Sequence, residues 1–247
     1  MTVLAPSPTE TTAALVAISH GTSSPAGQAA VAGLVEAVGS TLPSSIVAGG
    51  FVDVQQPDVQ ATLGVLDADR PAVIVPLLLS AGFHVHVDLV NEADASDRVT
   101  AISRALGPDD RLVHLLARRL AESGLTDTDS VVLCAAGSTD ARAVDDCRET
   151  AARLGIVLGR PVGVGFISAA QPPIETAVTA ARNSNPGSRV VVSTYLLAPG
   201  YFADLACATS ADVATPPLLT DGGTAPAELI DIVRDRYFDM LAGTDLS

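Results

Sequence analysis

The first half of the chain alternates between short apolar runs and segments with a helical spacing of apolar residues. Three runs, Ala14 to Ser19, Ile46 to Val54 and Ala72 to Leu79, lack polar alternation, which is typical of strands covered on both faces in a parallel sheet. The segments from Pro25 to about Val38 and from Pro57 to about Leu66 have helical patterns and begin at a proline. This order predicts right-handed βαβ units in a layered α/β fold.

The second half of the chain repeats the order of the first half. Three pairs of segments correspond at offsets of about 116 residues: ALVAISHGTSS at 14–24 with SVVLCAAGSTD at 130–140, GGFVDVQQPDV at 49–59 with VGFISAAQPPI at 164–174, and AVIVPLLLSAGF at 72–83 with RVVVSTYLLAPGY at 189–201. Three matches in register indicate an internal duplication. We therefore predict two tandem doubly wound parallel-sheet domains, with ligands bound beyond the carboxyl ends of the strands.

The repeats also suggest how the chain is divided. We expect residues 13–120 to form an N-terminal domain and residues 130–247 a second, degenerate copy. Residues 121–129 are the expected linker, and residues 1–12 are an expected disordered leader. Residues 1–14 lack the basic and apolar regions of a signal peptide. The three cysteines form no CxxC pair and fit a reducing compartment, so we expect a cytoplasmic protein.

Composition narrows the range of partners. The 247 residues are 48% hydrophobic and 17% charged, which is typical of a globular chain with a substantial core. The net charge of −14 repels nucleic-acid phosphates and anionic lipids. Aromatic residues make up only 3% of the chain and tryptophan is absent, which removes the usual stacking platforms for bases. We therefore expect neither a nucleic acid nor a membrane as partner, and no motif specifies an oligomeric state.

Histidines are the most informative polar residues, since the chain has only four. His20 follows the first predicted strand, and His84 and His86 lie in the loop expected after the third, where they would share one face if the segment stayed extended. His114 falls in an amphipathic helical pattern and is expected to be structural or exposed. A histidine hydrogen-bonded at a strand end and a solvated loop residue are the ordinary alternatives for His20 and His86.

The two strand-end histidines, His20 and His84, suit a divalent metal. The carboxyl ends of parallel strands meet at one edge of a sheet, so both neutral imidazoles would be available to one ion. The sequence offers no obvious third or fourth strong ligand, which favours an open site over closed structural zinc. Asp53, which we place on the central strand of the first copy, is a candidate to accept protons or orient an imidazole. A surface acid at a strand end is the alternative for Asp53.

Three motifs together resemble the class II chelatases, which insert iron or cobalt into sirohydrochlorin. They are Ser-His-Gly-Thr at 19–22, Gly-Phe-Val-Asp with Gln-Pro at 50–57, and Pro-Leu-Leu-Leu-Ser-Ala-Gly-Phe-His-Val at 76–85. The resemblance covers nearly the whole chain, because long members of this family have two copies of the unit around a central cleft. It implies that the active site lies in the cleft between the two domains, that His20 and His84 are the metal-handling pair, and that Asp53 stands where the family often has a glutamate.

The second copy departs from the chelatase pattern. Ala136 stands where the first copy has His20, Ser168 corresponds to Asp53, and Phe202 corresponds to His84. We therefore expect the second copy to have lost metal chemistry and to supply walls for the macrocycle. Weaker candidates for substrate binding follow from the same motifs: Gly21, Thr22, Ser80, Gly82, Phe83 and Ser138.

The resemblance implies a lyase that needs no prosthetic group and takes Fe²⁺ or Co²⁺ as a substrate together with sirohydrochlorin. Both metals suit imidazole, and iron is preferred because of family members with two copies. Either a histidine or Asp53 is the expected base for the pyrrole protons. The eight carboxylates of sirohydrochlorin oppose the net charge of −14, so we expect helix N-termini near Thr22–Ser24 and Ser138–Asp140, with Arg142 as a weaker aid, to receive them. A non-catalytic carrier of metal or tetrapyrrole is the alternative function.

Overall fold

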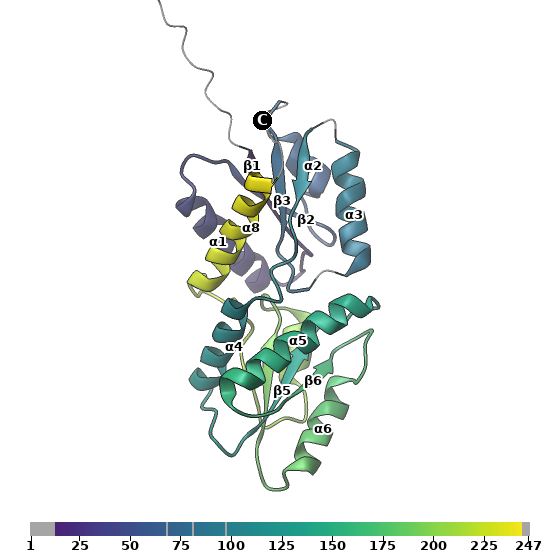
Figure 1. Cartoon of the computed structure of the whole chain (residues 1–247), viewed down its shortest axis with the longest axis vertical. Coiled ribbons are helices and arrows are strands. Elements are labelled where there is room, and N and C mark those ends of the chain that lie inside the picture. Colours follow the sequence, from purple (N-terminus) through teal and green to yellow (C-terminus); the bar gives the residue numbers. More distant parts are fainter. Residues whose placement is uncertain (1–12, 68, 81, 97, 244–247) are drawn as a thin grey trace, which may run out of the picture.

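The computed structural model describes residues 13–67, 69–80, 82–96 and 98–243, and of residues 83–88 it describes the backbone alone. Two layered α/β units lie one above the other (Figure 1). Within the described residues, each unit contains a four-stranded sheet in which all paired strands are parallel. The α/β fold class and the two tandem parallel sheets predicted from the sequence are confirmed.

The sheet of the first half has the strand order β2-β1-β3-β4. Its strands are β1 (Ala14–Ser19), β2 (Val47–Phe51), β3 (Ala72–Pro76) and β4 (Thr100–Ile102). The helices between these strands are α1 (Pro25–Thr41), α2 (Val59–Gly64) and α3 (Phe83–Asp94). All residues of β1 and β3 are buried, because helices cover both faces of the sheet.

The sheet of the second half has the corresponding order β6-β5-β7-β8. Its strands are β5 (Ser130–Ala135), β6 (Val162–Phe166), β7 (Val190–Tyr195) and β8 (Val213–Ala214). The helices α5 (Ala141–Leu158), α6 (Ile174–Ser184) and α7 (Tyr201–Cys207) follow β5, β6 and β7. The equal strand order in both sheets agrees with the duplication inferred from the sequence.

Several predicted ends of strands and helices are wrong, because turn and capping residues set them. The third strand ends at Pro76 instead of Leu79, and the second ends at Phe51, before a turn in which Val54 has a φ of +65°. Asp53 therefore lies in a turn after the edge strand β2 and not on a central strand. Helix α2 begins at Val59, because the Asp58 side chain caps it by accepting from the Ala61 N–H at 2.8 Å.

The prediction of a loop at His84 and His86 is also wrong. The backbone from Phe83 onward is the helix α3, with Gly82 at its N-cap. Positions two apart on a helix are separated by roughly 200° around its axis, so His84 and His86 do not share a face as they would in an extended segment. The side chains of Phe83, His84 and His86 lie outside the described part of the structure.

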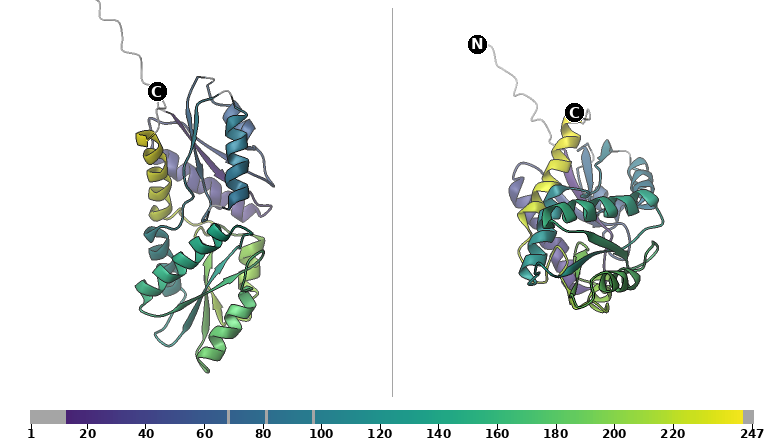
Figure 2. Two further views of the ribbon diagram at one scale, coloured as in Figure 1. Left: turned by 45° about the vertical axis from the view of Figure 1, so that its right-hand side comes forward. Right: turned by 60° about the horizontal axis from the view of Figure 1, so that its bottom comes forward.

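Two helices cross between the halves. Helix α4 (Asp110–Glu122) follows the first sheet in the sequence but packs on α5 and β7 of the second half. Helix α8 (Ala227–Gly243) ends the second half but packs on β3 and α1 of the first half, where it is the yellow helix in Figures 1 and 2. The predicted ranges 13–120 and 130–247 describe the two sequence repeats. In space, α4 of the first range packs with the second unit, and α8 of the second range packs with the first unit.

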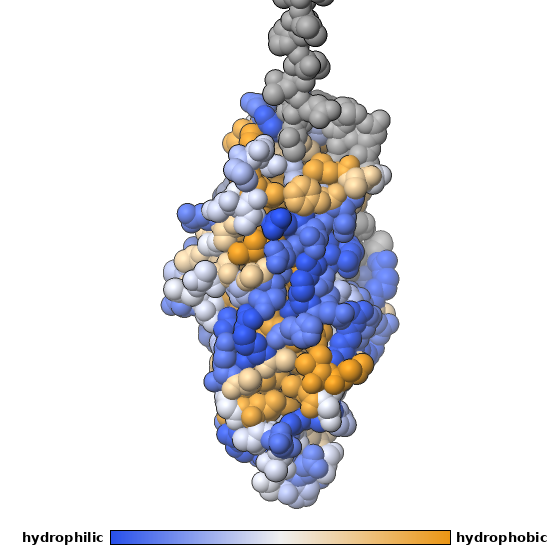
Figure 3. All heavy atoms as spheres, turned by 60° about the vertical axis from the view of Figure 1, so that its left-hand side comes forward, coloured by the Kyte–Doolittle hydropathy of each residue, from blue (hydrophilic) through white to orange (hydrophobic). Residues whose placement is uncertain are grey.

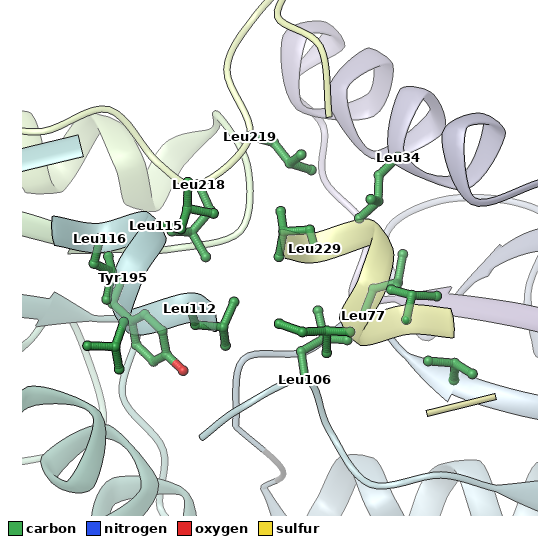
Figure 4. Packing of buried hydrophobic residues seen from close by; sticks show 14 of the residues in the cluster. Leu34, Leu77, Leu106, Leu112, Leu115, Leu116, Tyr195, Leu218, Leu219 and Leu229 are labelled. Carbon is green, nitrogen blue, oxygen red and sulfur yellow. The ribbon is translucent and has the colours of Figure 1, made fainter. Parts of the chain in front are cut away.

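The exchange of α4 and α8 joins the two halves in one apolar core. Leu77 and Leu106 of the first half belong to the same buried cluster as Leu218 and Leu229 of the second half (Figure 4). The face where α4 and α8 meet is covered by charged pairs such as Arg118 with Glu228, and hydrophilic residues gather across the middle of this side in Figure 3. None of the helices in the described part of the chain is long and apolar enough to cross a membrane.

A buried arginine fixes α8 to the first half. Arg236 is only 2% exposed, and its guanidinium donates to the carbonyls of Ala105 at 3.0 Å and Leu106 at 2.8 Å and to the Asp109 carboxylate at 3.2 Å. Burial lowers the pKa of Arg236, yet a guanidinium stays charged at neutral pH. Burial raises the pKa of Asp109, but hydrogen bonds and the charge of Arg111, with the hydrogen bond from Arg236, outweigh it and lower that pKa to about 2.

Replacing this arginine is expected to loosen the junction. Arg236→Met should lower the free energy of unfolding by about 3 kcal/mol, because two carbonyls and a carboxylate lose a buried charged donor. Urea unfolding of both variants measures the change. Arg234→Met is the matched control, since Arg234 makes only an exposed pair with Asp231 and should change stability by less than about 1 kcal/mol. Equal effects of the two substitutions would show that Arg236 does not hold the halves together.

The pKa of Asp109 predicts an acid-sensitive contribution to stability. A folded-state pKa of about 2, below the ordinary 3.8, means that the charged carboxylate stabilises the fold above about pH 4 and loses this effect as the pH falls to about 2. The stability difference between the parent and Asp109→Asn should therefore shrink over that interval in urea titrations at several pH values. Asp145→Asn, at an exposed pair, should show a small difference that changes little with pH. A parent-minus-Asp109→Asn difference that is constant from pH 5 to 2 would contradict the assignment.

Candidate functional site

A cleft of about 580 Å³ lies between the carboxyl ends of the two sheets. The segments that follow β1 and β3 in the first half line it together with the segments that follow β5 and β7 in the second half. This is where ligands bind in parallel α/β sheets. Of the residues singled out in the sequence, those that line the cleft are His20, Gly21, Thr22, Ser80, Gly82, Ser138, Ala136 and Phe202.

The loop that carries His20 is held against the turn after β2. Gly21 has a φ of +95°, and a Cβ on this residue would overlap the carbonyl oxygen of Asp53. The Asp53 N–H donates to the His20 carbonyl at 3.1 Å. Only glycine combines this backbone conformation with so close an approach. Gly21 therefore allows the loop after β1 to pack against the turn after β2. The His20 side chain itself is exposed at the cleft.

The second copy has the same backbone arrangement without the chemistry. Gly137 also has a φ of +95°, and a Cβ there would overlap the carbonyl oxygen of Ser168. The Ser168 N–H donates to the Ala136 carbonyl at 2.9 Å. The loop geometry is therefore common to both halves. Of the two equivalent positions, only the one in the first half carries an imidazole, because Ala136 replaces His20 in the second half.

Asp53 lies beside the cleft and does not line it. Its carboxylate is exposed and accepts from the Val54 N–H at 2.7 Å, whereas Val54 and Gln55 do line the cleft. This bond leaves the carboxylate with further acceptor capacity. Gln55 was not identified from the sequence, and the turn that brings it to the cleft depends on a β-branched residue with positive φ, which local preferences disfavour.

The two halves meet at both ends of the cleft through corresponding loops. A Cβ on Gly82 would lie 3.2 Å from the Ser138 Oγ, and one on Gly200 would lie 3.1 Å from the Thr22 Oγ1. Gly27, in the first turn of α1, packs so closely on the Pro199 carbonyl that a side chain there would overlap it. The loop after each third strand thus contacts the loop after the first strand of the other half, which fixes the width of the cleft.

Cys147 and Tyr195 also line the cleft, although sequence analysis did not single them out. The Tyr195 hydroxyl is buried and donates to the Leu79 carbonyl at 3.0 Å, which joins the second sheet to the first. Burial raises the pKa of the Cys147 thiol to about 11, so the thiol is protonated at neutral pH and is a weak metal ligand. Cys147 lies one repeat from Val31, which also lines the cleft; this correspondence is the signal that could have found it.

The described residues that line the cleft include no arginine, lysine, aspartate or glutamate. The backbone N–H groups proposed to receive carboxylates are partly occupied: Thr22 donates to Gln55, Ser24 to the Thr22 side chain, and Asp140 to the Ser138 side chain. Arg142 pairs with Asp140 at 3.1 Å. The wall around α7 is instead aromatic. Tyr201 and Phe202 are 70% and 37% exposed, with ring centroids 6.0 Å apart.

Metal ligands in the described side chains are few. No group of three histidine, cysteine, aspartate or glutamate side chains lies together in that part of the structure. His20 is the one described histidine at the cleft, and His84 follows the cleft residue Gly82 by two positions in the first turn of α3. His114 is exposed on α4 and does not line the cleft, as the amphipathic pattern predicted.

Two parallel α/β units with a cleft between their carboxyl edges define a duplicated chelatase-like fold. The family model for CbiX matches residues 14–123 and 130–207, so the chain belongs to the CbiX family. This confirms the resemblance inferred from the sequence motifs. A search of curated proteins finds no match.

Solved structures show the same fold over almost the whole chain. SirB from Bacillus subtilis with Fe³⁺ is 19% identical with a TM-score of 0.76, covering 94% of this chain and 98% of that one. The sirohydrochlorin chelatase SirB from Bacillus subtilis subspecies spizizenii in complex with cobalt is 17% identical with a TM-score of 0.71, covering 95% and 97%. CbiX, the terminal enzyme of siroheme biosynthesis in denitrifying bacteria, is 20% identical with a TM-score of 0.60, covering 90% and 98%.

The two strand-end glycines provide a test of the loop geometry. Gly21→Ala and Gly137→Ala should each lower the free energy of unfolding by about 1–3 kcal/mol, because alanine resists positive φ and meets a carbonyl oxygen. Gly33→Ala on α1 is the control: its Cβ would enter open space, and alanine should stabilise the helix by about 0.5–1 kcal/mol. Urea unfolding measures all three. Unchanged stability of Gly21→Ala would mean that the loops do not approach as described.

Proposed function

We propose that the protein inserts a divalent metal ion into sirohydrochlorin, with Fe²⁺ preferred over Co²⁺ as the substrate metal. The single observation that carries this proposal is a cleft between two copies of one fold, with a histidine on one wall only, in a chain of the CbiX family. The SirB structures, solved with Fe³⁺ and with cobalt, support both metals as substrates. The reaction belongs to siroheme or cobalamin biosynthesis.

His20 and His84 are the proposed metal-handling residues. A neutral imidazole replaces water on Fe²⁺ or Co²⁺ but binds less tightly than a thiolate, so the ion can pass on to the macrocycle. The buried, protonated Cys147 thiol does not compete for the ion. Because two histidine ligands would leave coordination positions open on a divalent ion, the ion could bind a histidine and a pyrrole nitrogen during the transfer.

Insertion of a divalent ion displaces two pyrrole protons, so the site needs a base. A histidine or the Asp53 carboxylate is the proposed acceptor; His20 lines the cleft, and Asp53 lies beside it. Imidazole accepts a proton or binds a metal only in its neutral form. The two histidines and Asp53 are thus the proposed catalytic residues.

The second half of the chain supplies the proposed binding wall for the macrocycle. Tyr201 and Phe202 present exposed rings at the cleft, and aromatic faces stack on flat conjugated ligands. The proposed contacts at its edge are Gly21, Thr22, Ser80, Gly82 and Ser138 in the loops, and Phe83 at the start of α3. The absence of charged groups among the described wall residues favours the flat apolar ring, while the carboxylates of sirohydrochlorin can remain at the solvent-exposed rim.

Absorption spectroscopy of sirohydrochlorin with Fe²⁺ or Co²⁺ tests the proposed function. The protein should accelerate the spectral change to the metallated form, and His20→Ala or His84→Ala should lower the rate at least about tenfold, equivalent to about 1.4 kcal/mol of barrier. His114→Ala is the matched control and should stay within about twofold.

A carrier of metal or tetrapyrrole is the second candidate function, because the same cleft and histidines suit storage. A carrier would bind the macrocycle or the ion without accelerating metallation. Rates equal to the protein-free reaction with both metals would reject the chelatase proposal. Equal losses in all three histidine variants would attribute the effects to folding.

A further inference from the structure

Two glutamine side chains hold the backbone of Thr22 from opposite sides. The Thr22 N–H donates to the Gln55 Oε1 at 2.8 Å, and the Gln28 Nε2 donates to the Thr22 carbonyl at 2.8 Å. Gln28 belongs to α1 and Gln55 to the turn after β2. Both side chains are half-buried, so each bond is partly shielded from competing water. We call Gln28 and Gln55 the glutamine clamp.

The glutamine clamp acts on the same loop as the backbone contacts of His20. The His20 carbonyl accepts from the Asp53 N–H at 3.1 Å, and Gly21 lies against the Asp53 carbonyl. Together with the clamp at Thr22, these contacts fix three consecutive residues of the loop. The orientation of the His20 Cα–Cβ bond is therefore determined by the loop and the turn after β2 together.

The turn that aims Gln55 at this loop has an unfavourable backbone. Val54 has a φ of +65°, and the Gln55 N–H donates to the Asp53 carbonyl at 2.7 Å, which is a γ-turn centred on a left-handed residue. Such a conformation costs about 1–3 kcal/mol for a residue other than glycine. It persists because the surrounding structure determines it, and here it brings the Gln55 amide to the Thr22 N–H.

The second copy shows that the turn forms without the two glutamine side chains. It keeps the γ-turn, with Ala169 at a φ of +55° and the Ala170 N–H donating to the Ser168 carbonyl at 2.6 Å. At the positions of Gln55 and Gln28, however, it has Ala170 and Val144, whose side chains have no hydrogen-bonding atoms. The same loop thus forms without a glutamine clamp in the copy where alanine replaces the histidine.

We propose that Gln55 and Gln28 are positioning residues that orient the His20 loop for metal handling. The proposal rests on the proposed function of the cleft, and it concerns the copy-specific side chains and not the shared scaffold. Without the clamp, the loop keeps its fold but gains alternative orientations, and the histidine meets the ion in the correct position for a smaller fraction of the time. Loss of a group that hydrogen-bonds a metal-ligating histidine typically lowers metal affinity 10–100-fold; the clamp acts through the Thr22 backbone, so we expect an effect at the lower end of this range.

Cobalt titration of the purified full chain tests the clamp without any tetrapyrrole. Gln55→Met, which has a similar length but no acceptor, should weaken Co²⁺ binding about tenfold, followed by the visible absorption of bound Co²⁺. The Thr22 amide proton resonance should move upfield as its hydrogen bond is lost. Gln28→Met should act in the same direction. The urea midpoint of both variants should stay close to that of the parent, as expected from the clamp-free second copy.

Two further variants make the test specific. Gln55→Glu keeps an acceptor for the Thr22 N–H and should restore the downfield amide resonance and at least the parent affinity for Co²⁺. Gln60→Met is the matched control, since the Gln60 amide donates to the Glu92 carbonyl on α3, away from the cleft, and should leave the Co²⁺ affinity and the Thr22 resonance unchanged.

Three results would overturn the proposal: parent-like Co²⁺ affinity in Gln55→Met, equal weakening in Gln60→Met, or no Co²⁺ binding by the parent. Failure of the proposed function gives a different result. In that case Co²⁺ binding would still depend on the clamp, but sirohydrochlorin would not be metallated faster than in the absence of protein.

Discussion

The exchange of helices α4 and α8 is the constraint on which the cleft depends. Each sheet is completed by a helix from the other half, and the buried guanidinium of Arg236 bonds α8 to the segment that leads into α4. Two units joined only by a linker would be free to move relative to each other. Because a continuous apolar core crosses the junction, the loops from both halves are instead held at fixed positions around the space between the sheets.

This fixed frame allows the two copies to specialise. The Gly21 and Gly137 loops have the same φ and the same close approach to the following turn, so the backbone at the cleft is nearly symmetric. At these loops the two copies differ in their side chains: Ala136 replaces His20, and Ala170 and Val144 replace Gln55 and Gln28. Under the proposed function, a symmetric pair of metal sites would place two cations on opposite sides of one macrocycle, whereas the asymmetric cleft has a histidine on one wall and aromatic rings on the other.

The sequence predicted the features that arise from local pattern and repetition. The limits of β1 match because an unbroken apolar run between polar residues has one interpretation in a parallel sheet. The α3 helix at His84 was missed because β-branched residues and histidine are weak helix formers, and packing overrides that preference. The exchange of α4 and α8 could not be predicted from the sequence. The apolar stripe of α4 indicates that one face of the helix is buried, but not which sheet covers it. Gln55 was missed for a related reason: its role depends on a turn with positive φ, not on a motif.

The charge distribution of this acidic protein is compatible with the acidic macrocycle of the proposed function. A net charge of −14 creates a negative potential around the molecule, which attracts divalent cations and repels carboxylates. The described cleft walls contain no charged side chain and end in exposed aromatic rings, so the repulsion acts at the rim, where solvent and salt screen it. Burial of a large flat ring against Tyr201 and Phe202 is not screened in this way, because it depends on apolar area. Under the proposed function, the cleft would therefore hold the macrocycle by its apolar face, while the surrounding negative potential would attract the metal ion.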